Sequence, residues 1–297
     1  MKETNNKYLI SIVIPLFNKE RTIADTLESI IKQDIKDTEI VIVNDGSSDN
    51  SLAIVTKLIQ KYNEVNFTLI NQENQGVSTA RNKGILNAQG TYILLLDADD
   101  LLLPNALMQL KKQIALYPNK DIYIGAYIEQ DTTVGTTRIS QNQKEGPIAN
   151  SLKALYKYEI CPRSGNCIIR QILLKEAGLF SSYITLYEDM ELFLKIMEKG
   201  SCFAFNEILL SYQRSDNGLS RKRTLISQEY AYYIKLKNEK NPILKSIKAD
   251  HLFRRIIRRI LIKDFKGSWK LIQHNPQLWY MLYHFTKRTI YKKQNHF

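Results

Sequence analysis

The chain has few cysteines and no long apolar run. Its three cysteines, Cys161, Cys167 and Cys202, form no CxxC pair. They are too few for a disulfide framework, so we expect buried thiols in a reducing compartment. The apolar run after the N-terminal MKETNNK is too short for a signal peptide. No stretch reaches the ~18 apolar residues of a transmembrane helix, which favours a cytoplasmic location.

Acidic residues are scarce at the C-terminal end. The net charge is +12, and residues 251–297 hold eleven Lys and Arg against one acid, Asp264, which makes that segment +10. A basic surface suits nucleic acid or an anionic membrane. No nucleic-acid-binding module is recognisable, so we expect no nucleic-acid partner.

Apolar runs alternate with helical patterns over residues 8–127. The predicted strands are Ile10–Ile14, Glu39–Val43, Phe67–Ile70, Tyr92–Leu96 and Asp121–Tyr127. The predicted helices are 22–32, 48–62, 78–88 and 104–117. This alternation indicates an α/β fold with right-handed βαβ units and a mostly parallel sheet.

The pattern is less regular after Tyr127. Residues 130–150 are polar and contain glycine and proline, which predicts a loop or flap. Further strands are predicted at 167–170 and 202–205, and helices at 170–177, at 189–199 and beyond 221. We therefore predict an α/β domain over residues 1–215 and a basic helical region over 216–297.

Three carboxylates, Asp97, Asp99 and Asp100, follow the predicted buried strand that ends at Leu96. Ligands of open α/β sheets bind outside the carboxyl ends of the strands. Carboxylates this close repel one another, and a cation relieves the repulsion. Mg²⁺ and Mn²⁺ prefer such oxygen ligands, completed by water and phosphate. The alternative is a solvated turn before a helix that Asp100 caps.

Other strand ends also carry polar groups. Asn18 and Glu20 follow the first strand and could hold a base or ribose. The alternative is a turn that leads into a helix capped by Asn18. Asp45 ends the second strand at the edge that Asp97 also occupies, with Ser48 as a candidate helix cap. Arg81 lies one turn into the third helix. A guanidinium near helix N-terminal amides suits a diphosphate, and the alternative is a surface arginine.

Four motifs occur in a fixed order: PLFNKE, VNDGSSD, NQGVSTARNKG and LLLDADD. In this order they resemble the family 2 glycosyltransferases, which have the GT-A fold. The resemblance covers about residues 8–215 and continues with RQILLKEAGLF and with YEDMEL. It implies a Rossmann-like, mostly parallel sheet with flanking helices. It also implies an inverting enzyme that uses a nucleotide-diphosphate sugar.

The resemblance also implies a role for each matching residue. The donor-binding residues would be Pro15, Phe17, Glu20, Asp45, Arg81, Asp97 and Ala98. The first three would line the nucleoside pocket, Asp45 would bind the base or ribose, and Arg81 would contact the diphosphate. Asp99 would bind Mn²⁺ or Mg²⁺. Asp189 would be the catalytic base, with Glu188 beside it.

The chemistry is consistent with these roles. A leaving diphosphate must be neutralised, which a divalent cation and Arg81 can do. A carboxylate must take the proton of the acceptor hydroxyl, and a base opposite the leaving group gives single displacement with inversion. The alternative for Glu188 and Asp189 is simple stabilisation of a helix N-terminus.

The sequence departs from the family pattern after the last strand. Many members have a YRxH-like segment there, whereas residues 212–220 contain no histidine and have Asp216 near its place. The four histidines lie at 251, 274, 284 and 296, and we expect none of them in the chemistry. The QxxRW pattern of processive synthases is absent, which favours the transfer of a single sugar.

The turn after the first strand argues against two other enzyme classes. A nucleotidyltransferase or a nicotinamide oxidoreductase needs a glycine-rich phosphate loop after the first strand, where this chain has PLFNKER. A non-enzymatic alternative is a catalytically weak nucleotide-sugar-binding or membrane-scaffolding protein of the same fold. The expected partners are a UDP-sugar and a glycan or lipid-linked acceptor, in surface polysaccharide synthesis.

The basic C-terminal region includes HLFRRIIRRILIK at residues 251–263, followed by Trp269, Trp279, Tyr280 and Tyr283. With helical geometry its apolar and arginine residues separate onto two faces. Such a helix suits an anionic membrane surface, which predicts peripheral association with the inner face of the cell membrane. The alternative is a helix whose apolar face packs on the catalytic domain.

Overall fold

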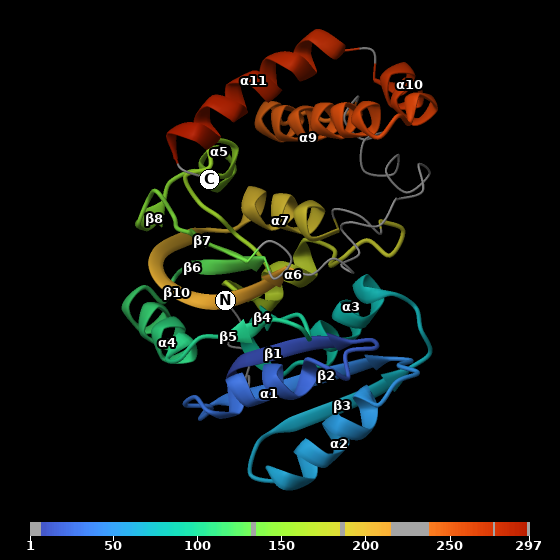
Figure 1. Ribbon diagram of the computed structural model, residues 1–297. Helices are drawn as coiled ribbons and strands as arrows, with labels where there is room; N and C mark the ends of the chain where they lie inside the picture. The colour runs from blue at the N-terminus through green and yellow to red at the C-terminus, as the bar shows by residue number, and fades with distance from the viewer. Residues whose placement is uncertain (1–6, 132–134, 185–187, 215–237, 276, 296–297) are drawn as a thin grey trace.

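The computed structural model describes residues 7–131, 135–184, 188–214, 238–275 and 277–295 (Figure 1). A ten-stranded sheet runs through the molecule, with the strand order β3-β2-β1-β4-β9-β6-β10-β5. The first four of these strands are parallel to one another: β1 (Tyr8–Leu16), β2 (Thr38–Asp45), β3 (Phe67–Gln72) and β4 (Gly90–Leu95). The predicted α/β fold and its four parallel strands are therefore confirmed.

Helices cover both faces of the sheet. On one face lie α1 (Ile23–Ile31), α2 (Ser51–Lys61) and α4 (Ala106–Leu116). On the other lie α3 (Val77–Asn87), α5 (Ser151–Tyr156), α6 (Gln171–Glu176) and α7 (Glu188–Lys199). Side chains of β1 alternate between the two faces: Ile12 lies in the hydrophobic cluster with α1, α2 and α4, and Val13 lies in the cluster with α3, α5, α6 and α7. A sheet buried on both faces explains why its strands read as continuous apolar runs.

The remaining strands complete the other half of the sheet. They are β5 (Leu101–Leu102), β6 (Ile122–Asp131), β7 (Thr136–Ser140), β8 (Gly146–Ile148), β9 (Cys167–Arg170) and β10 (Cys202–Arg214). β9 lies antiparallel between β4 and β6, whereas β10 runs parallel to β6. The loop that precedes β9 therefore reaches the edge where β4 ends. All three cysteines are buried and unpaired, as predicted.

The prediction of a loop over residues 130–150 is wrong. β7 pairs antiparallel with the outer part of β6, with Ile139 opposite Ile128, and β8 pairs with β10. Most of β7 is exposed to solvent, its one apolar residue Ile139 included, so the strand carries no buried pattern. Backbone hydrogen bonds hold such a strand, and polarity alone cannot distinguish it from a loop.

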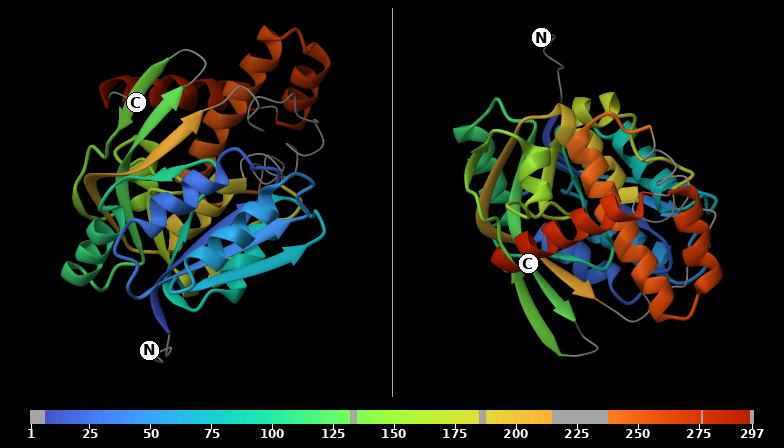
Figure 2. Two further views of the ribbon diagram at one scale, coloured as in Figure 1. Left: turned by 60° about the horizontal axis from the view of Figure 1, so that its bottom comes forward. Right: turned by 90° about the horizontal axis from the view of Figure 1, so that it is seen from above.

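Three C-terminal helices lie together beyond α5 and α7, on the side away from α1 and α2 (Figures 1 and 2). They are α9 (Pro242–Leu261), α10 (Phe265–His274) and α11 (Leu278–Gln294). Leu252 and Ile256 of α9 are buried in the hydrophobic cluster that also contains α5 and α7. The packing alternative for this amphipathic helix is therefore present in the structure. The division between residues 1–215 and 216–297 stays a prediction.

A buried ion pair fastens α11 to α9. Asp250 is fully buried and accepts from Arg288 at 3.0 Å and from Arg254 at 2.9 Å. Arg288 also donates through Nε to the carbonyl oxygen of Tyr156 in α5, at 3.1 Å.

Among the described residues, no helix is long and apolar enough to cross a bilayer.

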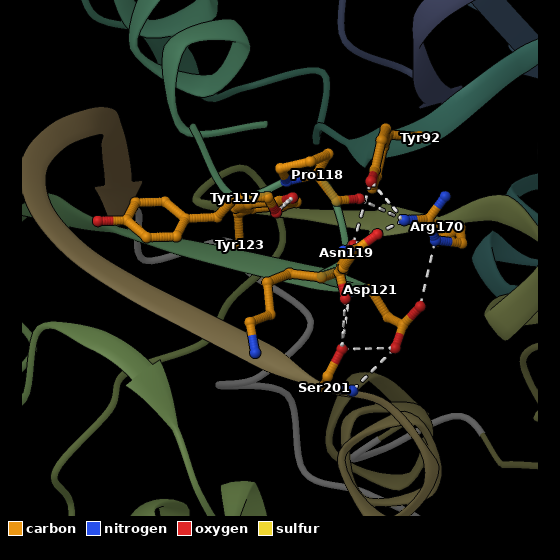
Figure 3. Close-up of polar contacts among 9 residues, drawn as sticks. Tyr92, Tyr117, Pro118, Asn119, Asp121, Tyr123, Arg170 and Ser201 are labelled. Carbon is orange, nitrogen blue, oxygen red and sulfur yellow. Dashed lines mark hydrogen bonds and ion pairs between the residues drawn. The ribbon is translucent and has the colours of Figure 1, made fainter. Parts of the chain in front are cut away.

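A polar network holds the edge of the sheet where β4 and β6 begin (Figure 3). Arg170, at the end of β9, donates to Asp121 at 3.1 Å and to the Tyr92 hydroxyl at 2.7 Å. Asp121 also accepts from the Ser201 hydroxyl at 2.8 Å, just before β10. One arginine thus connects β4, β6 and β9, and Asp121 extends the connection to β10.

We expect Arg170→Met to lower the free energy of unfolding by about 2–4 kcal/mol, because Asp121 and the backbone carbonyls of Pro118 and Lys120 lose a charged donor. Urea unfolding measures the change. Lys32→Met is the matched control, since it breaks an exposed ion pair with Glu28 on α1. Equal stability of the two variants would show that the network adds nothing to the sheet.

Candidate active site

The carboxyl ends of the parallel strands meet at one edge of the sheet. Phe17 follows β1, Asp45 ends β2 and Asp97 lies just beyond β4. Gly76 precedes α3 with φ +89°, a conformation that favours glycine, and the helix then begins at Val77. This turn directs the first turns of α3 toward the same edge.

Arg81 is the centre of the candidate site. It is 3% exposed, so the alternative of a surface arginine is wrong. Its Nη2 lies 2.7 Å from Oδ1 of Asp97. Its Nη1 lies 2.7 Å from Oδ1 of Asp189 and 3.5 Å from Oε1 of Glu188. One guanidinium thus brings together the acidic motif after β4 and the acidic pair in the first turn of α7.

The charges of this cluster alter its acid–base behaviour. Burial would lower the pKa of Arg81, but Asp189 and Asp97 raise it above its ordinary value, so the guanidinium stays charged. Burial and then Asp189 raise the pKa of Glu188 to about 7, with Arg81 opposing them. Burial also raises the pKa of Asp189, and Arg81 limits the rise. The Glu188 carboxyl therefore titrates near neutral pH.

We expect Glu188→Gln to gain stability relative to the wild type as pH rises from 5 to 8. The folded pKa of Glu188 is about 7, above the ordinary 4.5, so the folded state binds more protons between these values. Its stabilising effect is present below pH 4.5 and is lost as pH rises through 7. The difference between variant and wild type should grow by on the order of 2 kcal/mol.

Urea unfolding at both pH values measures this difference. Glu73→Gln, at an exposed position in the loop before α3, is the control for removing one carboxylate. If the stability of Glu188→Gln follows that of Glu73→Gln at both pH values, the Glu188 carboxyl does not titrate as described.

The acidic motif after β4 is held by cations of the chain itself. Asp99 forms an ion pair with Lys19. Asp100 is buried, and its Oδ1 accepts from the backbone N–H of Gln213 at 3.2 Å. Its Oδ2 has no hydrogen-bond partner among the described residues. Asn105 is the N-cap of α4, so the alternative in which Asp100 caps this helix is wrong.

The donor set suits a divalent cation in part. Within the part of the chain that the structure describes, no group of three or more His, Cys, Asp or Glu side chains could enclose a metal ion. Mg²⁺ commonly binds through one or two carboxylates and completes its shell with water and substrate phosphates. Asp99 and Asp97 offer such carboxylate oxygens, so the residues fit a cation that arrives with a phosphate ligand.

The expected nucleoside side of the edge is organised around Asp45. Its Oδ1 accepts from Nε2 of Gln72 at 2.7 Å and from the backbone of Gln75 at 2.9 Å. Its Oδ2 accepts from the backbone of Gly76 at 2.9 Å. Through these hydrogen bonds Asp45 fixes the loop between β3 and α3.

The other predicted donor-binding residues lie near the same edge. Phe17 is 43% exposed, which leaves its ring free to stack. Glu20 accepts from the backbone and the side chain of Asn50, both at 3.0 Å. Pro15 pairs with Val43 in the sheet. Ala98 is buried, and its carbonyl oxygen accepts from the hydroxyl of Thr22 at 2.8 Å.

The predicted cap of α2 is wrong. Asn50 is the N-cap residue of this helix, and its side chain makes no capping hydrogen bond. Ser48 instead donates its backbone N–H to Oδ1 of Asn18, at 2.8 Å. This contact ties the loop after β2 to the loop after β1.

Arg163 is a residue of the site that the sequence motifs did not predict. It lies in the loop before β9, with its guanidinium 3.2 Å from the ring centroid of Tyr212 and 5.4 Å from that of Tyr127. Its charge helps to lower the pKa of Asp97 and limits the rise in that of Asp189. In the sequence Arg163 is only a single basic residue in the segment CPRSGN. Its place beside the acidic residues follows from the antiparallel direction of β9, which the sequence does not reveal.

The histidine-free segment after β10 is only partly visible. Tyr212 belongs to β10, whereas Asp216 and the residues up to 220 lie outside the described residues. The structure therefore does not test what takes the place of the histidine. His251 and His284 lie in α9 and α11, among the C-terminal helices.

Comparison with known proteins gives a family match. Residues 11–177 match the model described as Glycosyl transferase family 2. The putative glycosyltransferase EpsH of Bacillus subtilis is 32% identical over 169 residues, which are 56% of this chain and 48% of that protein. Glycosyltransferase GlyG of Streptococcus pneumoniae is 36% identical over 128 residues, 43% and 42% of the two chains. The matches thus span about half the length of these relatives or less.

Solved structures match over more of the chain. Residues 1–349 of S. aureus TarS superpose with a TM-score of 0.67 and 19% identity, over 97% of this chain and 91% of that one. TarS in complex with UDP-GlcNAc gives 0.67 and 20%, over 94% and 81%. The mannosyltransferase PcManGT of Pyrobaculum calidifontis, in complex with GDP-Man and Mn²⁺, gives 0.55 and 14%, over 96% and 74%. These likenesses show a shared fold, the GT-A fold that the motifs predicted.

Proposed function

The chain belongs to glycosyl transferase family 2, and on that premise we propose that it transfers one sugar, with inversion, from a UDP-sugar to a hydroxyl of a glycan or lipid-linked acceptor. The observation that carries the proposal is the position of Arg81, which bonds Asp97 on one side and Asp189 on the other. A donor site and a base site would then share one buried cation.

At the donor, Arg81 would contact the diphosphate and stabilise the charge that develops on the leaving group. Phe17 and Glu20 would line the nucleoside pocket, with Pro15 and Asp45, and Asp97 and Ala98 would hold the donor beyond it. A TarS structure in complex with UDP-GlcNAc is among the solved structures of this fold, which supports a UDP-sugar as the donor.

Asp99 would hold Mn²⁺ or Mg²⁺, and this ion would neutralise charge on the leaving diphosphate. Support comes from the carboxylate donors after β4 and from the Mn²⁺ in the PcManGT structure of the same fold. Lys19 forms an ion pair with the Asp99 carboxylate. Lys19 would have to release it when the ion binds.

At the acceptor, Asp189 would act as the general base. Arg81 holds its Oδ1 at 2.7 Å, and Oδ2 would take the proton from the acceptor hydroxyl. The positive charge of Arg81 favours the ionised form of Asp189, which a base requires. Burial and then Asp189 raise the pKa of Glu188, beside it, to about 7, so the Glu188 carboxyl still holds its proton in part near neutral pH.

We further propose that the protein acts in surface polysaccharide synthesis and that residues 216–297 make up a basic helical region that follows the glycosyltransferase domain. Residues 251–297, with their net charge of +10, would attach the enzyme peripherally to the anionic inner face of the cell membrane. A catalytically weak nucleotide-sugar-binding or membrane-scaffolding protein of the same fold is the alternative, and the experiments below distinguish it.

We expect UDP to stabilise the protein only when a divalent cation is present. At about 100 times Kd, a ligand that binds only the folded state adds roughly 2.7 kcal/mol to the free energy of unfolding. Thermal unfolding with UDP and Mn²⁺, compared with UDP and EDTA, measures this.

Asp99→Asn should lose most of the Mn²⁺-dependent stabilisation by UDP. Asp25→Asn, which removes an exposed carboxylate on α1, should keep it. If UDP stabilises the wild type equally in EDTA, no metal bridges the nucleotide to Asp99.

We expect Asp189→Asn to leave UDP binding nearly unchanged and to slow sugar transfer by about 10² or more, because the variant keeps the size of the side chain but lacks a base. Calorimetry measures the affinity for UDP, and release of UDP in the presence of an acceptor measures transfer. Glu176→Gln, an exposed position on α6, is the control.

Two outcomes would change the assignment. Normal transfer by Asp189→Asn together with an inactive Glu188→Gln would make Glu188 the base. Normal transfer by both variants would leave the acidic pair as stabilisers of the α7 N-terminus and overturn the mechanism. UDP binding without any transfer in the wild type would favour the non-catalytic alternative.

A further inference from the structure

The apolar side of α9 is already used within the protein. Leu252 is fully buried and Ile256 is 3% exposed, both in the hydrophobic cluster that also contains residues of α5 and α7. The face that the sequence offered to a membrane is therefore not available to lipid along most of the helix. Any lipid contact must come from other residues of the basic C-terminal segment.

Apolar side chains emerge where α9 ends and α10 begins. We call residues 260–270 the α9–α10 corner. The exposed fractions of Leu261, Ile262, Phe265 and Trp269 are 76%, 50%, 64% and 60%. Ile262 directly follows α9, whereas Phe265 and Trp269 lie four residues apart in α10 and therefore share one side of that helix. The inner side of α10 is buried through Ser268 and Leu271.

The charge displayed at the corner has one sign. Lys263, Lys266 and Lys270 are exposed between the apolar side chains. Asp264 is the single acid of residues 251–297, and its carboxylate is already committed. It pairs with Arg259 and accepts the backbone N–H of Gly267 at 2.9 Å, which caps α10.

The corner is also held in one shape. Ile262 and Asp264 donate their backbone N–H groups to the carbonyl oxygens of Arg258 and Arg259, at 3.1 and 2.8 Å. Between them, Lys263 has φ +62°, which turns the chain sharply. A preorganised surface loses little conformational entropy when it binds.

We propose that the α9–α10 corner inserts into the interface of an anionic lipid bilayer, an inference that rests on the peripheral membrane attachment proposed above. Phe265 and Trp269 enter the boundary between head groups and acyl chains, where aromatic rings are favoured. The three lysines contact the anionic head groups. The rest of α9 stays packed on the enzyme and serves as the support for the corner.

Charge argues for lipid over a second copy of this chain. A symmetric contact between two corners would place Lys263, Lys266 and Lys270 of one copy against the same lysines of the other. Like charges across an interface oppose association, whereas an anionic head-group layer attracts all three. An oligomer built on this corner is one outcome of the test below.

The test uses the full chain and vesicles of phosphatidylcholine, with or without phosphatidylglycerol. We expect sedimentation with the anionic vesicles only, weakened at high salt. The double variant Phe265→Ser and Trp269→Ser should lose about tenfold or more in vesicle affinity. Each of Lys263→Gln, Lys266→Gln and Lys270→Gln should lose about fivefold.

The matched control is the double variant Leu86→Ser and Leu116→Ser. Its positions lie on α3 and α4 and are 57% and 59% exposed, comparable to Phe265 and Trp269. It should bind anionic vesicles as the wild type does. In a Trp279→Phe background, Trp269 is the single tryptophan, and its emission should shift to the blue when anionic vesicles are added.

Other results would overturn the proposal. Vesicle binding by the corner variant at wild-type affinity would move the membrane contact to another surface. No binding by the wild type would refute membrane attachment itself. A wild-type dimer that the corner variant converts to a monomer would make a second copy the occupant. UDP-dependent stabilisation of the same preparations tests the proposed sugar transfer separately and confirms that each variant is folded.

Discussion

The burial of one arginine constrains the whole candidate site. A guanidinium removed from water needs carboxylate partners, and removing any of them leaves an uncompensated charge. The partners of Arg81 come from different elements, Asp97 from the end of β4 and Asp189 from the first turn of α7. Their relative positions are therefore fixed by a single ion cluster. Because Arg81 lies between them, the carboxylates of Asp97 and Asp189 can lie close together despite their like charges.

The sheet explains how such distant residues meet. Parallel strands carry their carboxyl ends to one edge, and β9 enters between β4 and β6 in the opposite direction. This reversal adds the loop with Arg163 to an edge that parallel strands alone would fill with acids. At the other edge, Arg170 and Asp121 hold β4, β6 and β9 in register. One ionic cluster thus supports the site and another supports the framework below it.

Much of this arrangement could be predicted, and the limits have physical causes. Strands that are buried on both faces, such as β2 and β4, can be predicted from their apolar runs. The ends of these two strands then give the positions of Asp45 and Asp97. β7 was missed because an exposed edge strand needs only backbone pairing and carries no buried pattern. The burial of Arg81 could not be predicted either, because one of its partners, Asp189, lies more than a hundred residues later in the chain. Long-range pairing decided both.

The C-terminal helices show the same limit from another direction. Hydrophobic periodicity reports that one side of α9 avoids water, but a protein core and a lipid surface satisfy that pattern equally. The two possibilities are distinguished by the apolar residues that remain exposed once the core-facing residues of α9 are buried. Leu252 and Ile256 are buried, whereas Leu261 and Phe265, only a few residues later, have no protein covering most of their surface. The apolar residues beyond the end of α9, and not the periodic ones within it, therefore identify the surface that an external phase would cover.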